Sequence, residues 1–208
     1  MAEQYLSAYA VDADALLSLV GSRDEDLVRQ ALGRIEDLTA AGALLRATEP
    51  AEVRTTLREL VTGRLDPDRP AGYTWLLELL GPTVGEPLGS IVLPGRGWDE
   101  LTEAFVAWGL PALAELWGRP WAFPRAGAAP DDPWPFPTFA EPGALAAVLA
   151  ELAGFDTGRI HDDVELLPGG DEDAIEEVEA LVGEDLPAWV DGALGAGRGL
   201  LLVRDGGR

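Results

Sequence analysis

The chain has 208 residues, 47% of them hydrophobic, so it is long enough and apolar enough to bury a core. It carries 37 acidic and 15 basic residues, and the resulting formal net charge of −22 opposes binding to nucleic acid and to anionic lipid surfaces. The lack of cysteine excludes disulfides, thiolate nucleophiles and thiolate metal sites.

The first part of the chain predicts a strand followed by helices. Residues 4–11 (QYLSAYAV) carry the aromatic and β-branched side chains typical of a strand. Asp12 is expected to cap a short helix that ends at Gly21. Ser22, with Glu25 three residues later, predicts a capping box at the start of the next helix.

The middle of the chain predicts helices and one short strand. A helix is expected to begin at Pro50, and the turn-rich stretch 64–72 (RLDPDRPAG) is the best candidate for a boundary within the chain. The apolar run 73–80 predicts a buried helix, residues 91–93 a short strand, and residues 98–117 two consecutive helices.

Residues 118–143 (GRPWAFPRAGAAPDDPWPFPTFAEPG) differ in composition from the rest of the chain. Seven of them are proline and five are aromatic. Because proline removes a backbone donor and restricts the residue before it, this Trp/Pro-rich segment predicts irregular structure.

The C-terminal part predicts three helices and a closing strand. The helices are expected at 144–153, 171–182 and 186–194, and the apolar run 199–204 (GLLLVR) predicts a buried strand. If that strand pairs with residues 4–11, both chain ends meet in one sheet. The sequence therefore predicts one mostly helical α+β domain over residues 1–208, with a small sheet formed by the N- and C-terminal strands.

Residue usage indicates a compartment and a source. No run approaches the ~20 apolar residues of a membrane span, and the start of the chain lacks the features of a signal peptide, so we expect a cytoplasmic protein. All 15 basic residues are arginine, which together with abundant alanine, glycine and proline indicates a GC-rich bacterial genome. Solubility alone can favour an acidic surface, so the acidity does not by itself indicate a function.

The acidic residues concentrate near the C-terminus, with twelve carboxylates and no arginine over residues 162–191. Asp171 opens the predicted helix, and Glu172, Glu176 and Glu179 share one face of it. The simplest interpretation is a solvated face; the functional one is a docking face for a basic protein. A Ca²⁺ or Mg²⁺ site would use the same carboxylates, but the EF-hand spacing is missing.

The chain's single histidine, His161, lies beside Asp162 and Asp163. Such a trio suggests a metal site or an oriented general base. Since adjacent residues do not converge on one point, we interpret His161 as a surface-loop residue in a polar turn and predict no metal site.

The Trp/Pro-rich segment and the residues just before it predict either a cleft or an anchored loop. As a cleft, its aromatic side chains would hold an apolar ligand while an arginine binds an anion or carboxylate. As a loop, the same aromatics would fix a long irregular segment to the helices. The side chains concerned are Trp117, Trp121, Phe123, Trp134, Phe136 and Phe139, with Arg119 and Arg125.

Few residues of the catalytic types are present. The chain has one histidine and neither lysine nor cysteine, and its glycine-rich pieces match neither the dinucleotide fingerprint nor a phosphate loop. Catalysis by two carboxylates remains open. We predict no cofactor and favour a protein that is not an enzyme.

Four stretches of the sequence resemble a known family. They are YLSAYAVD at the start, VGSRDEDLVRQAL after the first helix, FPTFAEPGALAAVL, and GRGLLLVRD near the end. They are similar to an uncharacterised, mostly actinobacterial family of unknown function, and the similarity spans most of the chain. The resemblance implies a cytoplasmic bacterial protein in which both termini contribute strands, and it implies no activity or catalytic residues.

Three functions follow as hypotheses. The first is a non-catalytic inhibitor, immunity or adaptor protein whose acidic part binds a basic partner, since the charge falls from −5 over residues 1–70 to −10 over residues 160–208. The second is a small-molecule binding protein or enzyme that uses the Trp/Pro-rich cleft, with one arginine and a carboxylate such as Glu115 or Asp131. The third is a DNA mimic, which would need carboxylates arrayed like phosphates. Direct binding to nucleic acid or to a membrane is not expected.

Overall fold

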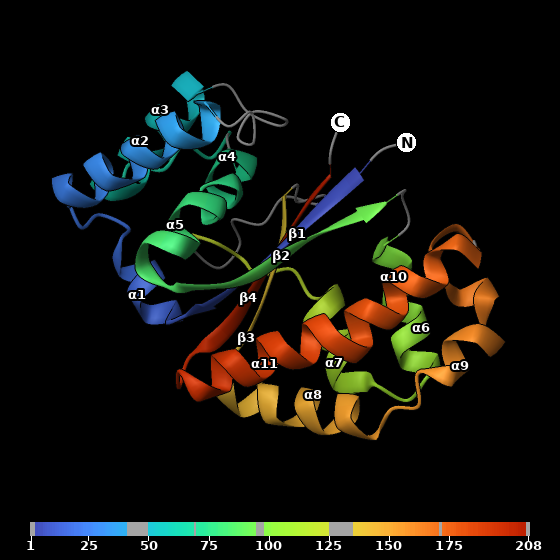
Figure 1. The fold of residues 1–208 in the computed structure, drawn as a ribbon. Helices are drawn as coiled ribbons and strands as arrows, with labels where there is room; N and C mark the ends of the chain where they lie inside the picture. The colour runs from blue at the N-terminus through green and yellow to red at the C-terminus, as the bar shows by residue number, and fades with distance from the viewer. Residues whose placement is uncertain are drawn as a thin grey trace.

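A four-stranded antiparallel sheet with the strand order β2-β1-β4-β3 forms the centre of the fold (Figure 1). The computed structural model describes residues 3–40, 50–68, 70–94, 98–124, 135–170 and 172–206. The strands are β1 Glu3–Val11, β2 Glu86–Pro94, β3 Phe136–Ala140 and β4 Gly199–Gly206.

The two chain ends pair in one sheet, as the sequence predicted, and they form its middle. β1 and β4 pair antiparallel along their length. In β4, Leu200 and Leu202 pack into the core on one face of the sheet, while Leu201 and Val203 pack into the core on the other. A strand that is buried on both faces is largely apolar, which is why residues 200–203 form a continuous apolar run. The predicted α+β fold is confirmed.

Helices cover both faces of this sheet (Figure 1). On one face lie α1 Ala13–Ser18, α2 Glu25–Ala40, α3 Pro50–Thr62, α4 Pro70–Trp75 and α5 Leu77–Val84. On the other lie α6 Leu101–Ala107, α7 Pro111–Gly118, α8 Pro142–Gly154, α9 Gly158–Asp162, α10 Ile175–Ala180 and α11 Leu186–Gly195. Short 3₁₀ turns precede α6 and α10, and a π-helical turn, Leu181–Asp185, joins α10 to α11. No helix in the described ranges is long and apolar enough to cross a membrane.

Each face of the sheet has its own hydrophobic core. The core beneath α1–α5 contains Tyr73 and Phe123, and the core beneath α6–α11 contains Trp98 and Trp117. The turn-rich stretch 64–72 leads from α3 to α4, and both helices contribute to the same core. That stretch is also tied down, because Tyr73 Oη donates to Glu59 Oε2 at 2.8 Å and accepts from the Asp66 N–H at 2.6 Å.

The helix starts follow the predicted capping chemistry once and depart from it once. Asp12 caps α1 as predicted, since its Oδ1 accepts from the N–H groups of Asp14 and Ala15 at 2.8 and 3.2 Å. The predicted capping box at Ser22 is wrong. Asp24 caps α2 instead, with Oδ1 2.9 Å from the N–H groups of both residues 26 and 27. A carboxylate binds these free N–H groups more strongly than a serine hydroxyl does.

The Trp/Pro-rich segment contains a strand that its composition did not predict. Residues 136–140 form β3, which pairs with β4 at the edge of the sheet, so irregular structure does not hold for them. An edge strand tolerates Pro137 because only one side of the strand needs donors. The Pro137 carbonyl instead accepts from the Trp121 N–H at 2.7 Å, which fixes the preceding segment against β3.

Candidate functional site

An open groove of about 900 Å³ lies where β3 forms the edge of the sheet. α7 and α8 line it together with the end of β3 and residues 119–122, and Leu17 of α1 also reaches it. The described residues that line the groove are Leu17, Pro111, Ala112, Glu115, Leu116, Arg119, Pro120, Trp121, Ala122, Phe139, Ala140, Glu141, Ala144, Ala147 and Val148. Most of them are apolar, so the groove offers a largely hydrophobic surface.

Aromatic rings form one wall of the groove. The half-buried Trp121 ring lies 5.0 Å from the Phe139 ring, centroid to centroid, with 32° between the planes. The centroid of the Trp121 ring also lies 5.5 Å from that of the buried Phe123 ring. Because backbone pairing with β3 also holds Trp121, its ring is a fixed apolar surface rather than a mobile one.

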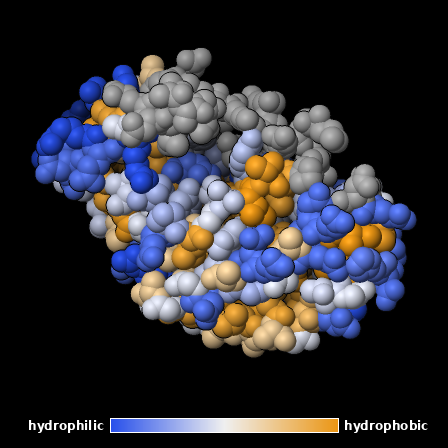
Figure 2. Space-filling model, viewed as in Figure 1, coloured by the Kyte–Doolittle hydropathy of each residue, from blue (hydrophilic) through white to orange (hydrophobic). Residues whose placement is uncertain are grey.

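The opposite side of the groove is formed by a helix with an uncharged outer face. The exposed positions of α8 are largely alanine, and Figure 2 shows hydrophobic residues gathered along this helix at the lower edge of the molecule. Ala144 and Ala147 lie on the groove side. Small side chains here leave the space that the groove occupies.

Three of the described residues that line the groove are charged. Glu115 and Arg119 are one helical turn apart, and their ion pair has a distance of 2.7 Å between Oε1 and Nη1, with 65% and 77% of the two side chains exposed. Glu141 occupies the N-cap position of α8 but makes no side-chain capping bond. Within the described parts of the chain, no hydrogen bond or ion pair engages the Glu141 carboxylate.

The spacing of α7 and α8 is fixed by a carboxylate at their crossing. Glu151 of α8 accepts from the N–H groups of Ala112 and Leu113, at 2.9 and 3.0 Å, and so caps the N-terminus of α7. These N–H groups have no partner within their own helix, and the helix dipole favours a negative charge there. Glu151 therefore sets the distance between the two helices that line the groove.

Replacing Glu151 with alanine is expected to lower the free energy of unfolding by about 1–2 kcal/mol, the range for loss of a capping side chain. Glu151→Gln keeps one acceptor oxygen, so its free energy of unfolding should fall by about half as much. Urea unfolding measures both, with Asp191→Ala on the exposed face of α11 as a control that stays within about 0.5 kcal/mol of the parent. An equal effect of Glu151→Ala and Asp191→Ala would show that the cap is not stabilising.

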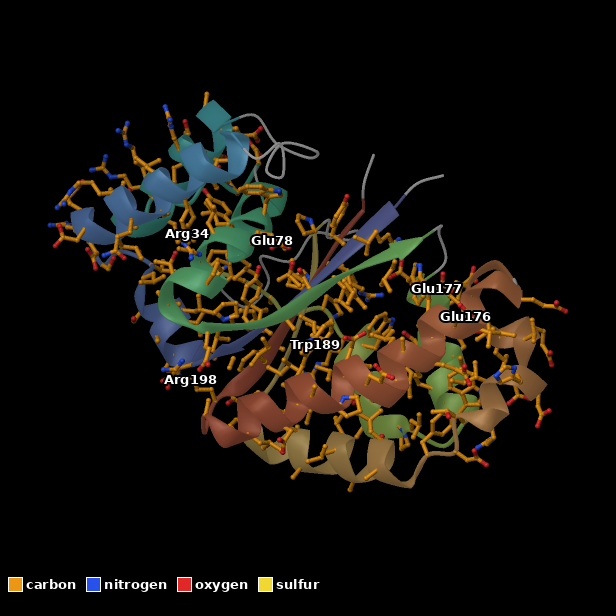
Figure 3. All side chains as sticks on the ribbon, in the orientation of Figure 1. Arg34, Glu78, Glu176, Glu177, Trp189 and Arg198 are labelled. Atoms are coloured by element: carbon orange, nitrogen blue, oxygen red, sulfur yellow. The ribbon has the colours of Figure 1, made fainter. Side chains whose placement is uncertain are left out.

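A second cavity, of about 490 Å³, adjoins the groove at Glu141, which lines both. The start of α1 contributes Asp12 and Asp14 to it, and the turn before β4 contributes Arg198. Figure 3 shows Arg198 at this turn, beside α1. Among the described residues, Arg198 forms no ion pair with these carboxylates, so the cavity holds three carboxylates against one guanidinium.

The structure separates the six candidate pocket residues into groups. Arg119 and Trp121 line the groove, as does Glu115 from the second hypothesis. Trp117 and Phe136 do not line it; their rings lie 4.5 and 4.4 Å from the guanidinium of Arg204 instead. The remaining two candidates, and the carboxylate considered with them, lie outside the described residues; they are Arg125, Trp134 and Asp131.

Arg204 is a buried cation that the sequence analysis did not single out. Only 2% of it is exposed, and burial lowers its pKa to about 10, partly offset by the nearby Asp99 carboxylate. It donates to Asp99 Oδ1 at 2.7 Å and to the Trp117 carbonyl at 2.8 Å. With its two ring contacts, Arg204 joins β4 to α7 and to the start of β3. The sequence did contain a sign of this: Arg204 follows Leu200 and Leu202 at intervals of two, so it faces the same side of the sheet as these two buried leucines.

The predicted acidic face lies elsewhere. Glu172 is in the 3₁₀ turn before α10, and Glu176 and Glu179 are in α10, while Asp171 lies outside the described residues. His161 is exposed as predicted but lies in helix α9 rather than in a loop, and its Nε2 is 3.0 Å from Glu179 Oε1. In Figure 3, Glu176 on α10 and Arg198 after α11 lie at opposite ends of the layer that these two helices form. In the part of the chain that the structure describes, no three His, Asp or Glu side chains form a group that could hold a metal ion.

The chain as a whole matches one family model. A family described as a domain of unknown function, DUF7691, matches residues 2–204, so the chain belongs to that family. This confirms the resemblance to an uncharacterised family. No curated protein and no solved structure matches the chain.

Proposed function

We propose that this protein binds a small organic molecule in the groove between α7, α8 and β3. The observation that carries the proposal is the groove itself, with about 900 Å³ of space, a mostly apolar lining and the fixed Trp121–Phe139 wall. Ligand sites in proteins commonly have ~300–1,000 Å³, apolar and aromatic walls and a few polar groups. This groove has each of these properties.

Binding rather than catalysis is proposed because of which polar groups the groove contains. Glu115 is already paired with Arg119, which leaves Glu141 as the unpaired titratable side chain among the described lining residues. That lining includes no serine, threonine, histidine or lysine to act as a nucleophile.

From its residue usage we also propose that the protein is cytoplasmic.

The acidic face supports a function less strongly than the groove does. Its case rests on charge, and one of its three described carboxylates, Glu179, is engaged by His161. Docking of a basic protein there stays a prediction from the sequence. Charge reversal at Glu172 and Glu176, both exposed, would test it through the salt dependence of association.

A thermal-shift screen of small organic compounds tests the groove. Ala146 and Ala147 are neighbouring exposed residues of α8, but only Ala147 is among the residues that line the groove. Ala147→Trp should fill the groove and lower the affinity for a binding compound tenfold or more, while Ala146→Trp should leave that affinity unchanged. Compounds that bind all three proteins equally, or no binding compound at all, would contradict the proposal.

A further inference from the structure

We infer that the ligand of the groove is an amphipathic organic amine, with its apolar body against Trp121 and Phe139 and its ammonium group at Glu141. The inference rests on the proposed function and adds the chemical class of the ligand. It follows from where charge is paired, and where it is not, along the groove and the cavity that adjoins it.

Within the groove, the described charged side chains leave one carboxylate unpaired. The Glu115–Arg119 ion pair, at 2.7 Å, cancels one carboxylate with one guanidinium. Glu141 has no such partner among the described residues, so the net charge at the groove wall is that of a single carboxylate. Glu141 also stands at the boundary with the second cavity, at one end of the apolar lining.

In the adjoining cavity, the described carboxylates outnumber the one guanidinium. Asp12 accepts two backbone N–H groups of α1, which partly compensates its charge. Asp14 is exposed, and its carboxylate, like that of Glu141, has no hydrogen-bond or salt-bridge partner among the described residues. Arg198 offsets one of these carboxylates at most. A cationic group that enters from the groove therefore meets two unengaged carboxylates, which form charge-assisted hydrogen bonds with an ammonium group.

The charge of the whole protein also favours a cationic ligand. A net charge of −22 raises the local concentration of cations and lowers that of anions around the protein. An anionic amphiphile of the same shape would find apolar surface but would meet Glu141 at the end of the groove. A neutral one would gain the apolar contacts alone. The charges thus rank the three ligand types in the order amine, alcohol, carboxylate.

Titration calorimetry with octylamine, 1-octanol and octanoate tests the ranking at neutral pH and low salt, below the concentrations at which these compounds self-associate. We expect octylamine to bind at least tenfold more tightly than octanol, and octanoate to bind more weakly still. Glu141→Gln should lower the affinity for octylamine at least fivefold and leave the affinity for octanol unchanged. Asp191→Asn removes one exposed carboxylate outside the groove lining and should change neither, which separates the local carboxylate from the overall charge.

The possible results distinguish the inference from the proposed function. Equal binding of octylamine and octanol, or tighter binding of octanoate, overturns the inference while the groove remains a ligand site. An unchanged affinity of Glu141→Gln for octylamine overturns the assigned position of the ammonium group. If octylamine does not bind but the compound screen yields a ligand that Ala147→Trp excludes, the inference alone fails. If neither experiment yields a groove ligand, both fail.

Discussion

Replacing Arg204 with alanine is expected to lower the free energy of unfolding by about 3 kcal/mol. The change removes a guanidinium that lies between the rings of Trp117 and Phe136 and donates to the Trp117 carbonyl. It leaves a space between the rings and a buried carbonyl with one hydrogen bond fewer. Its ion-pair partner Asp99 is more than half exposed and returns to water, which keeps the loss below that of a fully buried pair.

Two further variants separate packing from charge at this position. Arg204→Met refills the space between the rings without the hydrogen bonds, so we expect a smaller loss than for alanine. Arg29→Ala removes an exposed arginine that pairs with Asp26 on α2, and such pairs contribute about 0.5 kcal/mol. Urea unfolding followed by circular dichroism measures all three. A loss below about 1 kcal/mol for Arg204→Ala would contradict the role given to this cation.

Gly199→Ala is expected to cost about 1–3 kcal/mol through overpacking. A Cβ atom at Gly199 would stand 2.3 Å from Cζ of Phe139 and 2.7 Å from the Ala140 carbonyl oxygen, so the strand and the ring would have to separate. Because Phe139 forms part of the groove wall, the same change should also weaken ligand binding. Here glycine is required by the close approach of β3 to β4.

Gly143→Ala is the matched control for this prediction. A Cβ atom at Gly143 meets no atom within 4 Å, and the residue lies in α8, where alanine is the better helix former. We expect an unchanged or slightly higher free energy of unfolding, measured by the same urea titration. If Gly199→Ala were as stable as Gly143→Ala, the tight contact between Phe139 and β4 would be absent in solution.

The parts of the fold that were predictable are those governed by local patterns. Residues 4–11 carry the aromatic and β-branched side chains of a strand, and residues 200–203 are all apolar because β4 lies between two helical layers. Asp12 caps α1 through a contact with residues two and three positions away, which a sequence displays directly. Such features need no knowledge of distant residues.

The parts that were not predictable depend on contacts between distant residues. β3 is a strand because β4 offers it a free edge, although Pro137 within it argues against a strand. Arg119 and Trp117 are two residues apart, yet the end of α7 turns Trp117 into the core and leaves Arg119 at the groove. Composition identified a region rich in aromatics and arginine. The three-dimensional packing decided which side chains of that region line the groove and which surround Arg204.

Glu141 was not predicted as a site residue for a related reason. It precedes Pro142 at the start of α8, a position that indicates a helix end rather than a binding group. Glu141 lines two cavities only because α1, the start of α8 and the turn before β4 come together around them in the folded protein. No local pattern displays that meeting.

The most direct test of the groove as a ligand site is nuclear magnetic resonance of the tryptophan indole N–H groups during titration with octylamine. Trp121 lines the groove, whereas the indole of Trp117 is buried and donates to the Trp98 carbonyl at 2.8 Å, so the two resonances report on different places. We predict a saturable shift of the Trp121 signal, little change at Trp117, and loss of the shift in Ala147→Trp. A Trp121 signal that does not move, or that moves equally in Ala147→Trp, would contradict binding of the amine in the groove.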